Sequence, residues 1–200
     1  ARQVIPLRQP LIPYLRKLPN IIQKDKNFMY FLVSQWFTIL GTLGFTFYIL
    51  YGQETFKTSD SFGAIVTLVA LISQAIITPI IGKLGDHFGH RLATIVSIFL
   101  SMIAGIVITF APNESWLLVS FGLLSTSTSG LEISRPNLTI DLGFGNRLPT
   151  YLALSTTLLA IPTLIAPVFG GWLIEIVDFK PVFIVGIVFS LLGLFIILFK

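Results

Sequence analysis

GKLGDHFGHR, at residues 82–91, separates two long hydrophobic stretches of the chain and is rich in charged residues. It holds both histidines of the sequence, one aspartate and two basic residues. Three of its ten positions are glycine, which lets a backbone turn sharply. We therefore interpret this segment as a tight hairpin between two helices.

The composition indicates that these helices lie in lipid. Of the 200 residues, 54% are hydrophobic and only 11% are charged, whereas soluble domains contain about 25% charged residues. A soluble fold of this length could not bury so much apolar surface, so we expect the lipid bilayer to be a partner of the chain.

Six hydrophobic runs follow residue 27, each about as long as the ~20 residues with which a helix crosses a bilayer. The runs are continuous rather than alternating, which predicts helices and not a barrel. Their approximate limits are 28–51, 61–82, 92–111, 115–134, 149–173 and 181–199. The predicted fold is an all-α integral membrane protein with a six-helix transmembrane bundle at 28–200.

Lysine and arginine are divided unequally between the two sides of such a bundle. The side that holds both termini and the 83–91 and 135–148 connections has eleven, and the opposite side has only Lys57 and Lys180. Because positive charge favours the cytoplasm, both termini are predicted to be cytoplasmic. Residues 1–27 are basic and have leucines at helical spacing, so we interpret them as a cytoplasmic amphipathic linker on the membrane surface. A disordered basic tail is the alternative.

The predicted helices differ in polarity. The first, second, fourth and fifth carry polar residues, whereas the third and sixth are interpreted as outer supports, a pattern that repeats over two sets of three. The candidates for lining a cavity are Gln35, Thr38, Thr42, Gln74 and Thr78. The same side chains could instead form hydrogen bonds between helices.

Glu132 and Arg135 are three residues apart near the predicted end of the fourth helix, so they share a face and could pair. One hypothesis is a structural network in which Arg91 meets Glu132 while Asp86 meets Arg135 or the start of the fifth helix. The other is a coupling site at Glu132, for a proton or a substrate carboxylate.

Several other classes of protein do not fit. The basic residues lie in the gaps between hydrophobic runs and form no patch with aromatic residues, so nucleic acid is not an expected partner. No histidine lies inside a run, and there is no Gly-Lys-Ser/Thr loop, so we expect no enzyme. The chain lacks cysteine, and His87 and His90 have only Asp86 nearby, so we expect no metal and no cofactor.

The hairpin resembles the signature between the second and third helices of each half of Major Facilitator Superfamily transporters. That signature is Gly-x-Leu-Ala-Asp-Arg-x-Gly-Arg-Arg/Lys, and this chain departs from it at Gly85, His87 and His90. The resemblance implies a cytoplasmic gate motif that consists of Gly82, Leu84, Asp86, Gly89 and Arg91.

Two further segments carry the same resemblance. NRLPTY at 146–151 is similar to the lead-in of a helix in bacterial members, and APVFGG at 166–171 is similar to their Pro-x-x-Gly-Gly helix. In that helix, Pro162 and Pro167 either produce kinks or are merely tolerated because neighbouring helices satisfy the backbone, and Gly170 and Gly171 would allow close packing.

Together these segments imply the C-terminal half of a twelve-helix secondary transporter, with each half built from a 3+3 repeat. Its expected partners are an N-terminal six-helix half and a small-molecule substrate, with or without protons. Its expected location is the bacterial plasma (inner) membrane. A non-transporting membrane scaffold or assembly factor that retains this fold is the alternative.

Overall fold

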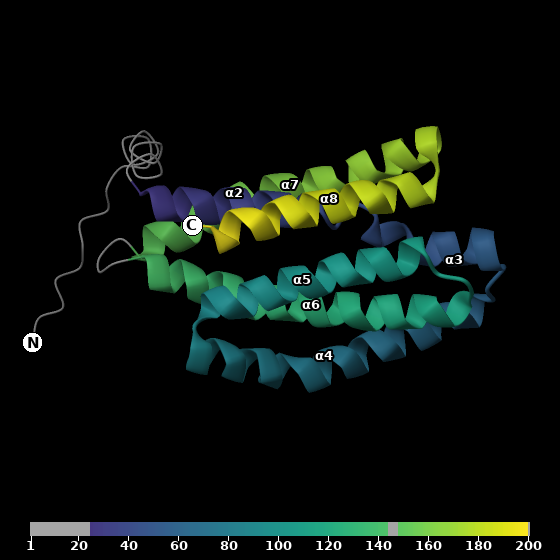
Figure 1. Cartoon of the computed structure of the whole chain (residues 1–200), viewed down its shortest axis with the longest axis horizontal. Helices are drawn as coiled ribbons and strands as arrows, with labels where there is room; N and C mark the ends of the chain where they lie inside the picture. The colour runs from purple at the N-terminus through teal and green to yellow at the C-terminus, as the bar shows by residue number, and fades with distance from the viewer. Residues whose placement is uncertain (1–24, 144–147, 200) are drawn as a thin grey trace, which may run out of the picture.

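The computed structural model describes residues 25–143 and 148–199, and most of these residues are helical (Figure 1). The part of the chain before residue 25, which contains most of the predicted linker, lies outside the described residues. The elements are α2 (Lys26–Leu40), the 3-10 helix η1 (Phe45–Phe47), α3 (Tyr48–Phe56), α4 (Asp60–Phe88), α5 (His90–Thr109), α6 (Glu114–Leu142), α7 (Leu148–Val177) and α8 (Phe179–Leu198).

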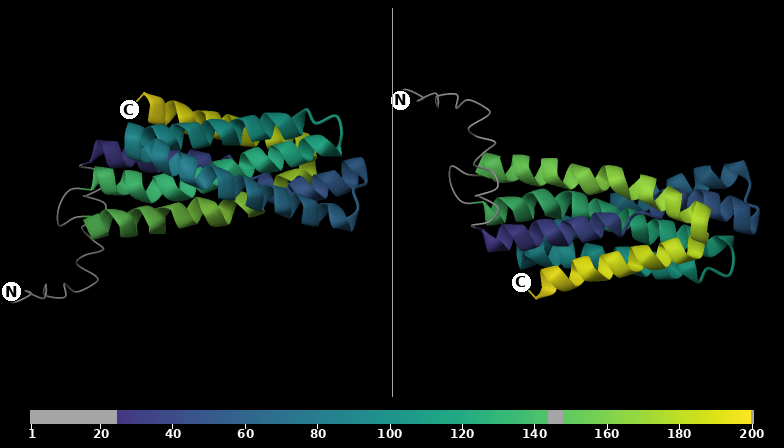
Figure 2. Two further views of the ribbon diagram at one scale, coloured as in Figure 1. Left: turned by 90° about the horizontal axis from the view of Figure 1, so that it is seen from below. Right: turned by 90° about the horizontal axis from the view of Figure 1, so that it is seen from above.

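The described residues form an antiparallel bundle, which confirms the predicted all-α fold. The α2, η1 and α3 segments follow one another, so the bundle consists of six long helical segments. The start of α2, the α4–α5 turn and the end of α8 lie at one end of the bundle (Figures 1 and 2). We call this the Gly89 end, after the residue between α4 and α5.

Two helices extend well beyond their predicted limits. Helix α4 continues to Phe88 rather than residue 82, and α6 continues to Leu142 rather than residue 134. The hydrophobic runs end earlier because the last turns of both helices are polar, and polarity does not stop a helix outside the apolar layer. The predicted hairpin therefore shrinks to Gly89, whose φ of 89° suits glycine and whose N–H donates to the Gly85 carbonyl at 2.9 Å.

The first predicted span, 28–51, is not one continuous helix. Helix α2 ends at Leu40, and turns at residues 41–44 precede η1 and α3. Short-range bonds hold this break, including Thr42 Oγ1 to the Ile39 carbonyl at 2.7 Å. Gly41 and Gly44 lie against Ser190 and Phe183 of α8, so the break is also a place where two segments approach closely.

The helix contacts follow an internal symmetry that residue identities do not reveal. Helix α5 packs on α6 as α2 packs on α8, and α4 packs on α6 as α2 packs on α7. Exchanging α2 with α6, α4 with α7 and α5 with α8 therefore maps these contacts onto one another. This is the contact pattern of the predicted 3+3 repeat.

Two buried serines of α6 serve packing between helices. Ser127 donates to the Ser97 carbonyl at 2.7 Å, and Ser120 donates to the Ala104 carbonyl at 2.8 Å, so two serines join α6 to α5. Helix α5 contacts α4, α6 and α8, and half of its most apolar stretch is buried.

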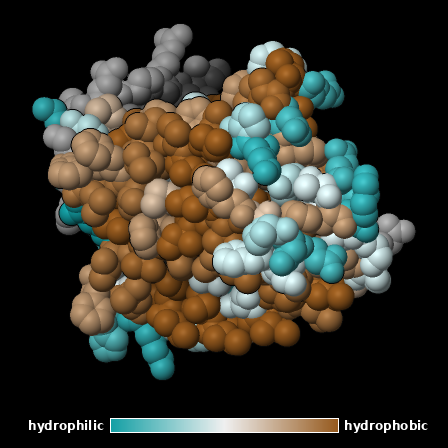
Figure 3. Space-filling model, turned by 45° about the vertical axis from the view of Figure 1, so that its right-hand side comes forward, coloured by the Kyte–Doolittle hydropathy of each residue, from teal (hydrophilic) through white to brown (hydrophobic). Residues whose placement is uncertain are grey.

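The surface is largely apolar, as expected for a protein in lipid. Hydrophobic side chains cover most of the face in Figure 3, and hydrophilic ones gather on its right-hand part. Among the described residues, five helices are long and apolar enough to cross a membrane; they are Lys26–Phe56, Ser61–Phe88, His90–Thr109, Leu148–Val177 and Phe179–Leu198. Helix α6 is not among them because its middle is rich in serine and threonine.

Candidate functional site

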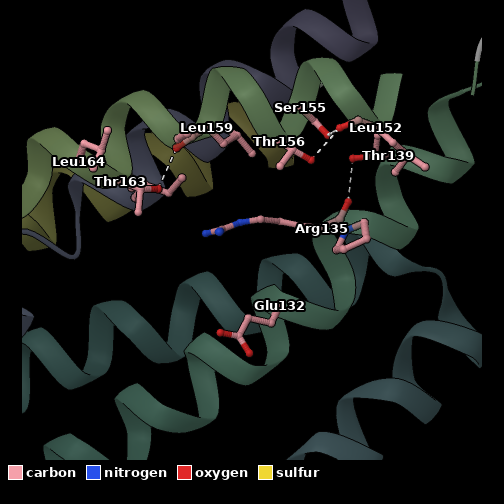
Figure 4. Close-up of a pocket in the computed structure, with 12 residues that line it drawn as sticks. Glu132, Arg135, Thr139, Leu152, Ser155, Thr156, Leu159, Thr163 and Leu164 are labelled. Atoms are coloured by element: carbon pink, nitrogen blue, oxygen red, sulfur yellow. Dashed lines mark hydrogen bonds between the residues drawn. The ribbon is translucent and has the colours of Figure 1, made fainter. Parts of the chain in front are cut away.

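A pocket of about 460 Å³ lies between α6 and α7, and one residue of α2 also lines it (Figure 4). This volume lies within the range of about 300–1,000 Å³ that holds a drug-sized ligand. Its lining is mostly apolar, with two charged residues on α6 and hydroxyls on α7. The lining residues are Ile39, Glu132, Arg135, Pro136, Thr139, Leu152, Ser155, Thr156, Leu159, Ala160, Thr163 and Leu164.

Arg135 extends from α6 into the space between the helices (Figure 4). Its Nε donates a hydrogen bond to Gln35 Oε1 of α2 at 2.6 Å. Gln35 is fully buried, and its Nε2 has no hydrogen-bond partner among the described residues. The bond therefore fixes one edge of the guanidinium and leaves its two Nη groups without a hydrogen bond in the described part of the chain.

The turn of α6 that carries the charged residues is adapted around Pro136. Proline has no N–H, so the Glu132 carbonyl loses its usual helical donor. Side chains satisfy two nearby carbonyls: Asn137 Nδ2 donates to Ile133 at 3.0 Å, and Thr139 Oγ1 donates to Arg135 at 2.8 Å. The helix continues through Pro136 to Leu142, so both charged side chains stand on one helix.

Both charged residues lie within α6, well before its end. At 1.5 Å per residue, Glu132 lies about 15 Å and Arg135 about 10 Å from the helix end at Leu142. The expectation that the helix is nearly finished at Glu132 is therefore wrong. Arg135 is half-buried between the helices, where a charge is costly, so it needs a partner or a function.

Glu132 lines the pocket and is exposed, so it lies at the rim. Within the described residues it forms neither a hydrogen bond nor an ion pair, and the pairing with Arg91 is absent. Its carboxylate also makes no direct contact with Arg135, as Figure 4 shows. The pocket thus holds one cationic and one anionic group that do not neutralise each other by contact.

The hydroxyls of α7 are already used as donors within their own helix. Ser155 and Thr156 donate to the Leu152 carbonyl at 3.0 and 2.8 Å, and Thr163 donates to Leu159 at 2.8 Å. They can still accept a hydrogen bond from a ligand. The donors left free in the pocket are therefore those of Arg135.

The predicted cavity residues separate into two groups. Gln35 contacts the pocket only through Arg135, and the Thr38 and Thr42 hydroxyls bond backbone carbonyls of α2. Gln74 is half-buried and Thr78 is exposed, both on α4, and neither lines the pocket. The two threonine hydroxyls of the first span thus bond carbonyls of α2 and do not join it to another helix.

Arg91 fastens the hairpin to the end of α8. Its Nε and Nη2 donate to the Ile197 carbonyl at 3.1 and 2.8 Å, and Nη2 also donates to Leu198 at 3.2 Å. These carbonyls belong to the last turn of α8, which lacks helical donors and carries the negative end of the helix dipole. Arg91 therefore caps α8.

Other residues of the hairpin motif are less constrained than expected. Asp86 is exposed and accepts no hydrogen bond in the described part of the chain, so its predicted contact with Arg135 or α7 is not formed. Gly82 has no atom within 4 Å of where a Cβ would lie, whereas Gly85 lies against the His90 ring. Close packing explains Gly85 but not Gly82.

The family model described as Major Facilitator Superfamily matches residues 28–200. The chain belongs to the Major Facilitator Superfamily. It is accordingly an integral membrane protein of a transporter family and not an enzyme. The six-helix bundle, with its 3+3 contact pattern, has the fold of one half of a transporter of this superfamily.

Curated relatives agree with this assignment to the Major Facilitator Superfamily. The chain is 26% identical, over 64% of its length, to the multidrug transporter protein MdtP of Bacillus subtilis (strain 168), and covers 25% of that protein. It is 27% identical over 77% of its length to YdgK, an uncharacterized MFS-type transporter of the same organism, and covers 39% of it. The chain thus spans well under half of either relative.

The contact between Gln35 and Arg135 is the feature of the site that sequence reasoning missed. Both residues were singled out, but as a cavity-lining amide and as a partner of Glu132 or Asp86. The signal that could have joined them is that Gln35 is a strongly polar side chain within a hydrophobic run and Arg135 directly follows another run, so each could need a partner from another helix.

Proposed function

We propose that this chain is the C-terminal six-helix half of a secondary transporter that moves a small solute by alternating access. The observation that carries the proposal is the pocket between α6 and α7, which opens to the surroundings and holds Arg135 and Glu132 without direct contact between them. A closed structural network would not leave the two Nη groups of a half-buried arginine without a hydrogen-bond partner in the described part of the chain. A site that exchanges a ligand would.

The exposure of α4 and α7 suggests where the other half docks. These two helices occupy equivalent positions in the contact pattern, and both pack on α6. Only 11% of the most apolar stretch of α4 and 28% of that of α7 are buried. An N-terminal six-helix half that covers these faces would enclose the pocket, and the bundle would rock against it.

The relatives and the charge pattern support the remaining parts of the proposal. One relative bears the name multidrug transporter, which favours transport over the scaffold alternative. The excess of basic residues at the Gly89 end favours a cytoplasmic position for that end and for both termini. The Bacillus relatives favour a bacterial plasma membrane.

Transport by the complete protein tests this proposal. Proteoliposomes with the purified protein should take up a substrate found in a compound screen, and Asp86→Asn should lower the rate at least several-fold at equal protein levels. Asp86 is exposed, so its loss should not unfold the bundle. Lys83→Gln removes another exposed charge from the same turn and should leave the rate near that of the unaltered protein. A folded protein that moves no screened compound would favour a scaffold.

A further inference from the structure

We infer that the pocket between α6 and α7 recognises an organic anion, with the free Nη groups of Arg135 as its anchor. This inference rests on the proposed function, because it names the substrate class of that transport site. The first observation is the state of the guanidinium. It is held by a neutral amide at one edge, and its remaining donors face a cavity without a partner in the described chain.

The geometry of the fork favours a carboxylate or another planar or tetrahedral oxyanion. An arginine held through Nε presents its two Nη groups at fixed positions, and two parallel N–H groups match two oxygens of one anion. Gln35 acts as the positioning residue, because its Oε1 sets the plane of the guanidinium. The hydroxyls of α7 already donate within their own helix, so the donors that an anion needs come from Arg135.

The rest of the lining defines the body of the ligand. Ile39, Leu152, Leu159 and Leu164 surround the charged corner with apolar surface. A small hydrated anion would have to exchange its water for these side chains at a cost, whereas an aromatic or aliphatic acid would bury its body against them. The inferred class is therefore an acid with an apolar body, rather than an inorganic ion.

Glu132 carries the charge opposite to that of Arg135, so changing it should have the opposite effect on the binding of an anion. Its carboxylate shares the pocket without touching Arg135, so it partly balances the guanidinium when the site is empty and repels an arriving anion. Removing its charge should tighten the binding of an acid. If the pocket instead recognised a cation through Glu132, removing that charge would abolish binding, and removing the arginine would strengthen it.

The experiment uses the complete protein in phosphatidylcholine nanodiscs and three probes with one aromatic body. They are 2-naphthoate, 2-naphthamide and 2-naphthyltrimethylammonium, and binding is measured by isothermal titration calorimetry. We expect naphthoate to bind at least tenfold more tightly than the other two, as a charge-assisted double hydrogen bond allows. Tighter binding of the cation, or equal binding of the acid and the amide, would overturn the inference.

Variants assign the preference to the pocket. Arg135→Lys keeps the charge but loses the fork, and it should weaken naphthoate binding about tenfold or more without changing naphthamide binding. Gln35→Leu should give a smaller loss in the same direction, and Glu132→Gln should tighten naphthoate binding a few-fold. If Glu132→Gln weakened it, the inference would be wrong even if an arginine variant failed to fold.

An anionic lipid headgroup could supply the same chemistry, so a second set of nanodiscs contains phosphatidylglycerol. Competition that depends on Arg135 would identify lipid as a source of the anion and would support the anion site. The binding result is also independent of transport. Arg135-dependent binding without uptake would support the anion site and contradict the proposed transport function. Uptake of only cationic compounds would support the transport function and contradict the anion site.

Discussion

Gly89 and Gly82 belong to one sequence motif, yet they should respond in opposite ways to the addition of a methyl group. Gly89 has φ 89° and ψ 145°, a region that is nearly restricted to glycine, so Gly89→Ala should destabilise the bundle by about 1–3 kcal/mol. Gly82 lies inside α4 with open space around it. Gly82→Ala should therefore be neutral or stabilise the protein by roughly 0.5–1 kcal/mol.

Thermal unfolding of the purified protein in detergent checks this pair. Because both substitutions add the same atoms within one hairpin, general effects of expression or detergent cancel. A lower unfolding temperature for Gly82→Ala than for Gly89→Ala would contradict the conformational argument.

Arg91 should contribute to stability through α8. Arg91→Leu removes three hydrogen bonds to the last carbonyls of that helix, and bonds from a charged donor are worth about 1.5–3 kcal/mol each at most. We expect a clear drop in unfolding temperature and faster proteolysis after Leu198, with partial retention for Arg91→Lys. Lys83→Leu, at an exposed position in the same motif, is the control and should change little.

The partner of Arg91 also changes the expected result of charge exchange. If Arg91 paired with Glu132, the double variant Glu132→Arg with Arg91→Glu would restore what either change lost. Since Arg91 bonds the end of α8 and Glu132 borders the pocket, we expect no rescue in stability or transport. Recovery of the double variant would indicate that the two residues pair in another state of the transporter.

The break after Leu40 packs closely against two neighbouring glycines of α7, and Gly170 should tolerate a larger side chain less well than Gly171. A Cβ at Gly170 would overlap the Leu43 carbonyl oxygen, which belongs to the backbone and cannot rotate away. A Cβ at Gly171 would lie 3.1 Å from the Phe47 ring, whose side chain can shift. Gly170→Ala should therefore destabilise the protein by about 1–3 kcal/mol.

The matched variant is Gly171→Ala, for which we expect a loss well below that of Gly170→Ala. Both are compared by thermal unfolding, and transport adds a second measurement. Equal losses would show that the break tolerates displacement of α7. The sequence suggested packing for both glycines, but only the position of Leu43 separates them.

The orientation of the whole bundle follows from the charge distribution and can be tested directly, because the chain has no cysteine. Glu54→Cys and His87→Cys place single thiols at exposed positions on opposite ends of the bundle. In intact cells, a membrane-impermeant maleimide should label residue 54 and not residue 87. After permeabilisation both should be labelled, which controls for reactivity. The reverse pattern in intact cells would invert the proposed topology.

At the scale of the whole molecule, the sequence identified the membrane class, the number of helical segments and the hairpin after the second of them. These properties follow from hydrophobic runs and from local turn residues, so neighbours along the chain are enough to reveal them. The sequence placed the ends of α4 and α6 too early, because hydrophobicity marks the lipid layer and not the helix. It also missed the break after Leu40, because no proline marks it.

Only the tertiary structure shows which residues are hydrogen-bond partners. Helical periodicity shows which residues share a face, but it does not show which face meets which helix. Arg135 bonds Gln35 across a hundred residues of chain, Arg91 bonds Ile197, and Ser127 bonds Ser97. Each pairing depends on how six helices pack together, which is a property of the assembled bundle. For that reason the charged residues were recognisable from the sequence, but their roles were not: Arg91 caps α8, whereas Arg135 and Glu132 line an open pocket.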